Sequence, residues 1–210
     1  MINKLNLFAF NIEDEELLLS SFNSMNNINK IQLVEHNYTS KELQLIVSEQ
    51  LNLNANHELT FQNLFELRLR NNYYIAQCLI DKFFQIPNRD SQRTDRDYEF
   101  HIIGMYKPPL QIKNTIVRKE EFIDQIIKLF DRQDKLLGTD EHFNRKFIVQ
   151  SDSIFNLEKV MNQNAIDIFN ENPDLVLSTW SDYILISFIN SFEISHTRIV
   201  EKIFEEFDNA

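Results

Sequence analysis

Glycine and cysteine are the residues of which this chain has least. Among its 210 residues there are two glycines, Gly104 and Gly138, and one cysteine, Cys78. Phosphate-binding loops need several closely spaced glycines, because their backbone N–H groups must approach an anion. The nucleophile elbow of serine hydrolases has the same requirement. The sequence therefore excludes these sites, and a single cysteine forms neither an intrachain disulfide nor a cysteine zinc cluster.

Long hydrophobic runs are also absent. No apolar run approaches the ~18 residues that a membrane-spanning helix needs. The first residues, Met1-Ile2-Asn3-Lys4, do not lead into the apolar core of a secretory signal. Together with the lone cysteine, which is typical of a reducing compartment, these absences predict a cytoplasmic protein without a membrane partner.

Basic residues are fewer than acidic ones, and the formal net charge is −11. Residues 151–210 carry eleven acidic and three basic residues, whereas residues 61–150 are close to neutral. Affinity for nucleic acid or an anionic membrane depends on clustered Lys and Arg, so the composition predicts neither partner. The acidity serves solubility alone, or it attracts a basic protein partner.

The N-terminal part predicts alternating strands and helices. Leu5–Phe10 and Lys30–His36 have strand patterns, and Asn11 is a candidate cap for a helix with an acidic first turn. Thr39 and Glu42 have the spacing of a capping box, which predicts that a second helix begins there.

The clearest local pattern is a β-hairpin. Apolar and polar residues alternate through residues 59–70, which predicts a strand with one wet side. Asn71-Asn72 is suited to a two-residue turn and would pair Leu67 with Ala76 and Phe65 with Cys78. The predicted buried face comprises Phe65, Leu67, Leu69, Tyr74, Ala76 and Cys78.

The rest of the chain also alternates predicted strands and helices. We expect a polar loop at residues 88–97, strands at Tyr98–Tyr106, Phe143–Gln150, Leu175–Trp180 and Tyr183–Ile189, and helices over residues 119–132, from Ser151, Asp152 or Ser153 to Pro173, and after Ser195. The fold class predicted is α+β: an antiparallel meander sheet with amphipathic helices and a C-terminal β-α-β-β-α module. We expect a single domain over residues 1–210, with sub-modules 1–58, 59–117 and 118–210 as the alternative division.

Three short apolar motifs resemble a family of uncharacterised, often membrane-anchored bacterial proteins. They are Ile103-Gly104-Met105-Tyr106, Thr115-Ile116-Val117 and the segment from Phe143 to Asp152 (FNRKFIVQSD). The resemblance covers residues 98–190 and implies a fold but no activity. This chain departs from the family because it lacks a membrane anchor.

No spacing of catalytic, cofactor-binding or metal-ligating residues is present. None of the five histidines lies three or four residues from another, so we predict no catalytic residue, cofactor or metal ligand. Two functions remain open. The first is a non-enzymatic protein-interaction module: an inhibitor, an immunity-type protein or an assembly subunit. The second is a hydrolase whose site is assembled from dispersed residues, such as His101, His142 and nearby acids.

The candidate partner surface lies on the last predicted helix. Ile199, Ile203 and Phe207 would form its buried side, and Glu201, Glu205 and Asp208 would point outward. Acidic groups near a helix C-terminus oppose the helix dipole, so this arrangement does not help the helix itself. Either this cost is tolerated, or the three residues serve to attract a basic partner.

Overall fold

The structure is a computed structural model of the chain. It describes residues 15, 16, 19, 20, 22, 23, 26, 31–33, 41–51, 53, 54, 56–67, 73–87, 92–121, 136, 137 and 140–209. Helices and strands alternate through this part of the chain, and the predicted α+β class is confirmed.

In the described part of the chain, one eight-stranded sheet forms the centre of the fold, and every strand pair in it is antiparallel. Its order is β1-β2-β3-β4-β8-β7-β5-β6. The strands are β1 (Ile31–Leu33), β2 (His57–Leu67), β3 (Tyr73–Pro87), β4 (Gln92–Tyr106), β5 (Ile116–Lys119), β6 (Phe147–Gln150), β7 (Leu175–Trp180) and β8 (Tyr183–Phe188). The predicted pair β7–β8 and its Ser181-Asp182 turn are confirmed, with Trp180 opposite Tyr183.

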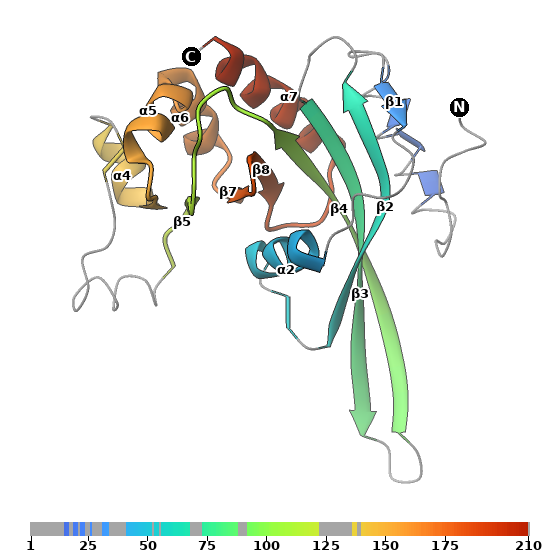
Figure 1. Ribbon diagram of the computed structural model, residues 1–210. Helices are drawn as coiled ribbons and strands as arrows, with labels where there is room; N and C mark the ends of the chain where they lie inside the picture. Colours follow the sequence, from blue (N-terminus) through green and yellow to red (C-terminus); the bar gives the residue numbers. More distant parts are fainter. Residues whose placement is uncertain are drawn as a thin grey trace.

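Helices lie against both faces of this sheet (Figure 1). They are α2 (Lys41–Gln50), α4 (Glu141–Lys146), α5 (Ile154–Val160), α6 (Gln163–Glu171) and α7 (Ile194–Asp208). On one face, Leu43 and Val47 of α2 pack against β-strand residues such as Cys78 and Ile80. On the other face, α4 to α7 contribute to a larger core that includes Phe204. Burial on both faces departs from the prediction of one wet side for the strand at residues 59–70.

The predicted register of the β2–β3 hairpin is wrong. Ala76 pairs with Leu64 and Cys78 pairs with Phe61, whereas the expected partners were Leu67 and Phe65. Phe65 pairs with Ile75 instead. The Asn71-Asn72 turn on which that register depended lies outside the described residues.

The displacement of the register has two parts. Ala76 lies opposite Leu64 instead of Leu67, three residues away, and a β-bulge between Phe61 and Asn63 adds a fourth residue, so that Cys78 lies opposite Phe61 instead of Phe65. A displacement by an odd number of residues exchanges the faces of one strand relative to the other. Phe65 therefore lies in the core beneath α7, whereas Ala76 and Cys78 lie in the core beneath α2. The predicted single buried face mixes residues of both cores. Cys78 is fully buried, as expected of a small hydrophobic residue.

The predicted polar loop is mostly strand. Gln92–Asp97 belongs to β4 and pairs residue by residue with β3 out to Gln92 opposite Pro87. The strand pairs through its backbone groups, which polar residues supply as well as apolar ones. β3 and β4 are therefore 15 residues long each, and their ends project from the body of the molecule as a ribbon (Figure 1).

Two further boundaries need correction. Residues 143–146, expected in a strand, form the end of α4, because Asp140 accepts a hydrogen bond from the Phe143 N–H and caps that helix. The long helix expected before Pro173 is divided into α5 and α6. Asn162 caps the second helix by accepting the Ala165 N–H, so a new helix begins where one was expected to continue.

Several predictions fall largely outside the described residues: the strand Leu5–Phe10, the caps at Asn11 and Thr39, and the helix over residues 119–132. Within the described part, Lys119 ends β5 and so does not begin a helix. Ile31–Leu33 lies within the strand predicted at Lys30–His36, and α2 follows the predicted capping box.

The last helix packs closely on β4. Its N-cap is Glu193, not Ser195, and the Glu193 N–H donates to His196 Nδ1 at 3.2 Å. A Cβ at Gly104 would lie 2.5 Å from Val200 Cγ1 and 2.7 Å from Phe204 Cζ. Glycine at this position thus lets α7 approach the strand, which is a physical reason for the glycine in the Ile103–Tyr106 motif.

Candidate functional site

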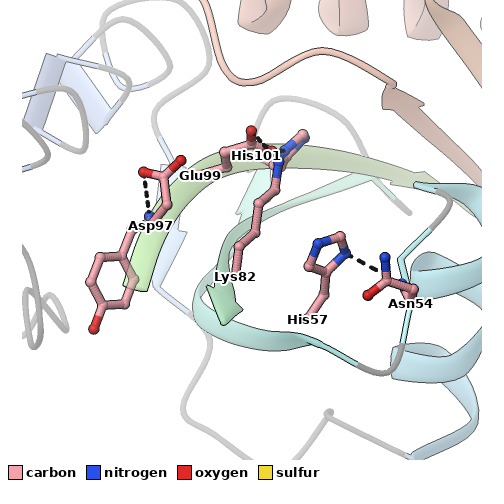
Figure 2. A network of polar contacts seen from close by, with 7 residues as sticks. Asn54, His57, Lys82, Asp97, Glu99 and His101 are labelled. Atoms are coloured by element: carbon pink, nitrogen blue, oxygen red, sulfur yellow. Dashed lines mark hydrogen bonds and ion pairs between the residues drawn. The ribbon is translucent and has the colours of Figure 1, made fainter. Parts of the chain in front are cut away.

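A cluster of ionisable side chains lies where the ribbon leaves the sheet. His57 pairs with Lys82 across β2 and β3, and Glu99 and His101 face Ile80 and Cys78 across β3 and β4. Side chains two residues apart on a strand share a face, so all four ionisable residues lie on the α2 side of the sheet. Figure 2 shows this arrangement.

Glu99 links the cluster. Its carboxylate forms an ion pair with Lys82 Nζ, and its Oε2 lies 3.6 Å from His101 Nε2. The Glu99 side chain is 30% exposed, whereas that of His101 is 2% exposed. A molecule in solvent therefore reaches the carboxylate and not the imidazole.

The protonation states follow from burial and charge. Burial lowers the pKa of His101, and this outweighs the opposite effect of the nearby Glu99 carboxylate. Burial by itself would raise the pKa of Glu99, but the Lys82 ammonium and His101 lower it overall. At neutral pH the cluster thus combines a carboxylate with a neutral imidazole.

His57 and the nearby Asp97 accept hydrogen bonds from backbone N–H groups. The Asn54 N–H donates to His57 Nδ1 at 3.3 Å, and the Tyr98 N–H donates to Asp97 Oδ1 at 3.0 Å. Both contacts satisfy backbone donors next to the ribbon (Figure 2). The cluster therefore anchors the base of the ribbon, and its one buried base, His101, is shielded from solvent.

A pocket of about 240 Å³ lies on the same side of the sheet, between α2 and strands β5 and β7. Its lining is Ile46, Glu49, Asn114, Thr115, Ile116, Gln150, Ser178 and Thr179. Glu49 is the single ionisable side chain among these residues. General acid–base catalysis needs a titratable side chain placed to transfer a proton, and Glu49 is the one candidate that this lining offers.

The acidic residues predicted on α7 do not share one surface. Glu205 and Asp208 are exposed, but Glu201 is buried at 7% exposure, so the expectation that it points outward is wrong. The buried side of α7 is wider than the predicted stripe, because Thr197, Val200 and Phe204 are buried as well, and Glu201 lies within it. Ile203 and Phe207 are buried as predicted.

The two histidines of the alternative enzyme hypothesis are not brought together. His101 lies in β4, whereas His142 is exposed on α4, next to β6. Three strands separate β4 from β6, which is about 19 Å at the usual strand spacing. Among the residues that the structure describes, no group of three or more His, Cys, Asp or Glu is placed to hold a metal ion.

Comparison with known proteins does not assign this chain to a family. No protein-family model, curated protein or solved structure matches this chain. The resemblance to an uncharacterised bacterial family therefore stays a prediction. Within the described residues, no helix is both long enough and apolar enough to cross a membrane.

Sequence reasoning missed the Lys82–Glu99–His101 cluster. Glu99 and His101 have the two-residue spacing of neighbours on one strand face. Lys82 joins them only through the β3–β4 register, in which Ile80 pairs with Glu99. Lys82 and Glu99 both lie in strands that the sequence predicts, but a long polar loop between two strands does not determine which of their residues stand opposite each other.

Proposed function

We propose that this protein is a non-enzymatic protein-interaction module, in the class of inhibitors, immunity-type proteins and assembly subunits, and that the β3–β4 ribbon contacts a basic protein partner. The projecting ribbon is the observation that carries this proposal. Beyond Lys82 and Asp97, β3 and β4 pair with each other and with no other described strand.

The ribbon is ordered by contacts of its own. Arg96 lies over the Phe83 ring at 4.9 Å, and Arg96 Nη1 lies 3.4 Å from Asp81 Oδ2. A two-stranded ribbon in water is marginally stable and adds little to the stability of the domain. Its length is thus better explained by contact with a partner than by folding.

Charge and chemistry support the same proposal. The net charge of −11 attracts basic surfaces over a distance. The alternative, a hydrolase, has less support, because His101 is buried and His142 lies on another part of the sheet. The one cysteine, Cys78, is free and buried, and we place the protein in a reducing compartment such as the cytoplasm.

A ribbon-shortened variant tests the proposal. Replacing Gln85–Thr94 by Asn-Gly leaves Phe84 opposite Asp95 and closes the ribbon with a two-residue turn. We expect the variant to unfold at the same urea concentration as the parent, but to lose a partner that the parent captures from cells of its source. If every captured protein binds both forms equally, the ribbon is not the contact element.

A further inference from the structure

Backbone groups at alternate residues of β4 point away from β3, toward an edge that no strand in the described part of the chain covers before Gly104. The Phe100 carbonyl accepts the Phe192 N–H at 2.7 Å, so the backbone groups of Phe100 point away from β3. Pairing between β3 and β4 continues without a bulge to Gln92. Because outward and inward groups alternate in an antiparallel strand, Gln92, Thr94, Arg96 and Tyr98 also direct N–H and C=O outward.

The outward N–H of Tyr98 already has a hydrogen-bond acceptor. Its N–H donates to Asp97 Oδ1, an arrangement that fits an outward donor with no strand beside it. No strand in the described part of the chain pairs with the outer edge at Gln92, Thr94 or Arg96, since β8 reaches only Gly104–Tyr106. The segment Gln92–Arg96 contains no proline, so each residue keeps the backbone N–H that strand pairing needs.

We propose that a second copy of this chain pairs with this edge, antiparallel and about a two-fold axis at Thr94. Such a pair joins two eight-stranded sheets through about six backbone hydrogen bonds between the outward groups of Gln92, Thr94 and Arg96 in each copy. This inference is independent of the proposed function, which concerns a different, basic partner.

The charges of Arg93 and Asp95 favour a second copy of the chain as the partner, and they favour pairing about an axis at Thr94. With the axis at Thr94, the register positions of Arg93 and Asp95 stand opposite each other, twice over. An axis at Arg93, Asp95 or Arg96 would instead place identical charges opposite each other. Like charges directly opposite destabilise strand pairing and opposite charges stabilise it, so the sequence order Arg-Thr-Asp is complementary to itself.

The contact is small, so the association is weak and depends on concentration. Light scattering or sedimentation at about 0.15 M salt, where repulsion between the acidic copies is screened beyond about 8 Å, measures it directly. We expect the mass to rise with loading from 25.1 kDa toward twice that value.

Charge exchange is the decisive comparison. Arg93→Asp alone and Asp95→Arg alone each place like charges opposite, and each should weaken the dimer about tenfold or more. The double variant Arg93→Asp/Asp95→Arg restores opposite charges and should restore the dimer. Arg96→Pro, which removes an outward N–H, should also abolish dimerisation, whereas Arg96→Ala keeps that N–H and should retain it.

Three results would overturn the inference: a monomer at every loading, a dimer indifferent to both single charge variants, or a double variant that stays as weak as the single ones. The charge variants leave the backbone chemistry intact, so the test stands even if Arg96→Pro fails to fold. Capture of a basic partner by a chain that remains monomeric would support the proposed function and reject this dimer.

Discussion

Gly104 shows how one residue sets the distance between a helix and a strand. It lies in β4, and Val200 and Phe204 of α7 fill the space where a side chain would begin. Tyr73 on the neighbouring strand donates its hydroxyl to the Phe204 carbonyl at 3.0 Å. The close contact at Gly104 and the hydrogen bond from Tyr73 together hold α7 against the sheet.

Gly104→Ala should therefore destabilise the protein. The added methyl group overpacks the contact with Val200 and Phe204, a change that typically costs about 1 to 3 kcal/mol. Urea denaturation measures the loss. Val200→Ala in the Gly104→Ala background removes the nearest clashing atom and should recover part of it; equal stability of Gly104→Ala and the parent would show that α7 does not need this close approach.

At the scale of elements, α7 is held at its start by a buried histidine. The His196 ring stacks on Phe188 with centroids 3.8 Å apart, and its Nδ1 accepts the Glu193 N–H. Burial lowers the pKa of His196, with Asp174 and Glu193 acting in the opposite direction. Protonation at Nδ1 would remove the acceptor for the Glu193 N–H.

Stability should fall as the solution is acidified below neutrality. His101 and His196 both have a folded-state pKa below the ordinary value of 6.5, so the unfolded chain binds protons that the folded chain does not. Their contribution is intact above pH 6.5 and is lost as the pH falls through and below that value. Thermal unfolding measured between about pH 7 and pH 5 should show a decreasing Tm.

A histidine replacement identifies the source of that slope. His196→Gln should lower stability at neutral pH and make the Tm less sensitive to pH over the same range. The same replacement at the exposed His142 is the control, and it should leave the slope unchanged. An equal slope in His196→Gln and the parent would show that α7 is not the acid-sensitive element.

At the scale of the whole molecule, acidity governs encounters with other proteins. The formal net charge of −11 should speed association with a basic partner at low salt and slow it as salt rises. The double variant Glu205→Gln/Asp208→Asn removes two exposed charges and should lower the association rate. If the association rate of a captured partner changes neither with salt nor with these substitutions, the acidity does not steer association and serves solubility instead.

A second whole-molecule prediction concerns metals. A chelator should leave the Tm of the protein unchanged, because the described residues place no ligand group for a metal ion. Differential scanning fluorimetry with and without EDTA measures this. A clear drop in Tm on chelation would contradict this prediction.

The sequence by itself determined the elements whose signals are local. The strands Leu175–Trp180 and Tyr183–Phe188 follow from apolar runs around a short turn, and α7 follows from its helical periodicity. The burial of Cys78 was also predicted correctly. These features depend on residues close in sequence, whose spacing and turn chemistry act before any long-range contact forms.

The tertiary structure decided the rest, because it depends on partners that are distant in sequence. The bulge after Phe61, the second buried face and the pairing of Gln92–Asp97 arise when β2 and β4 align on β3. Glu201 is buried because tertiary packing covers a wider side of α7 than its sequence pattern predicts. Lys82 also meets Glu99 only in the folded sheet, where Ile80 stands opposite Glu99. Alternation along one strand leaves open which set of side chains lies on which face of the sheet, and long-range packing decides this.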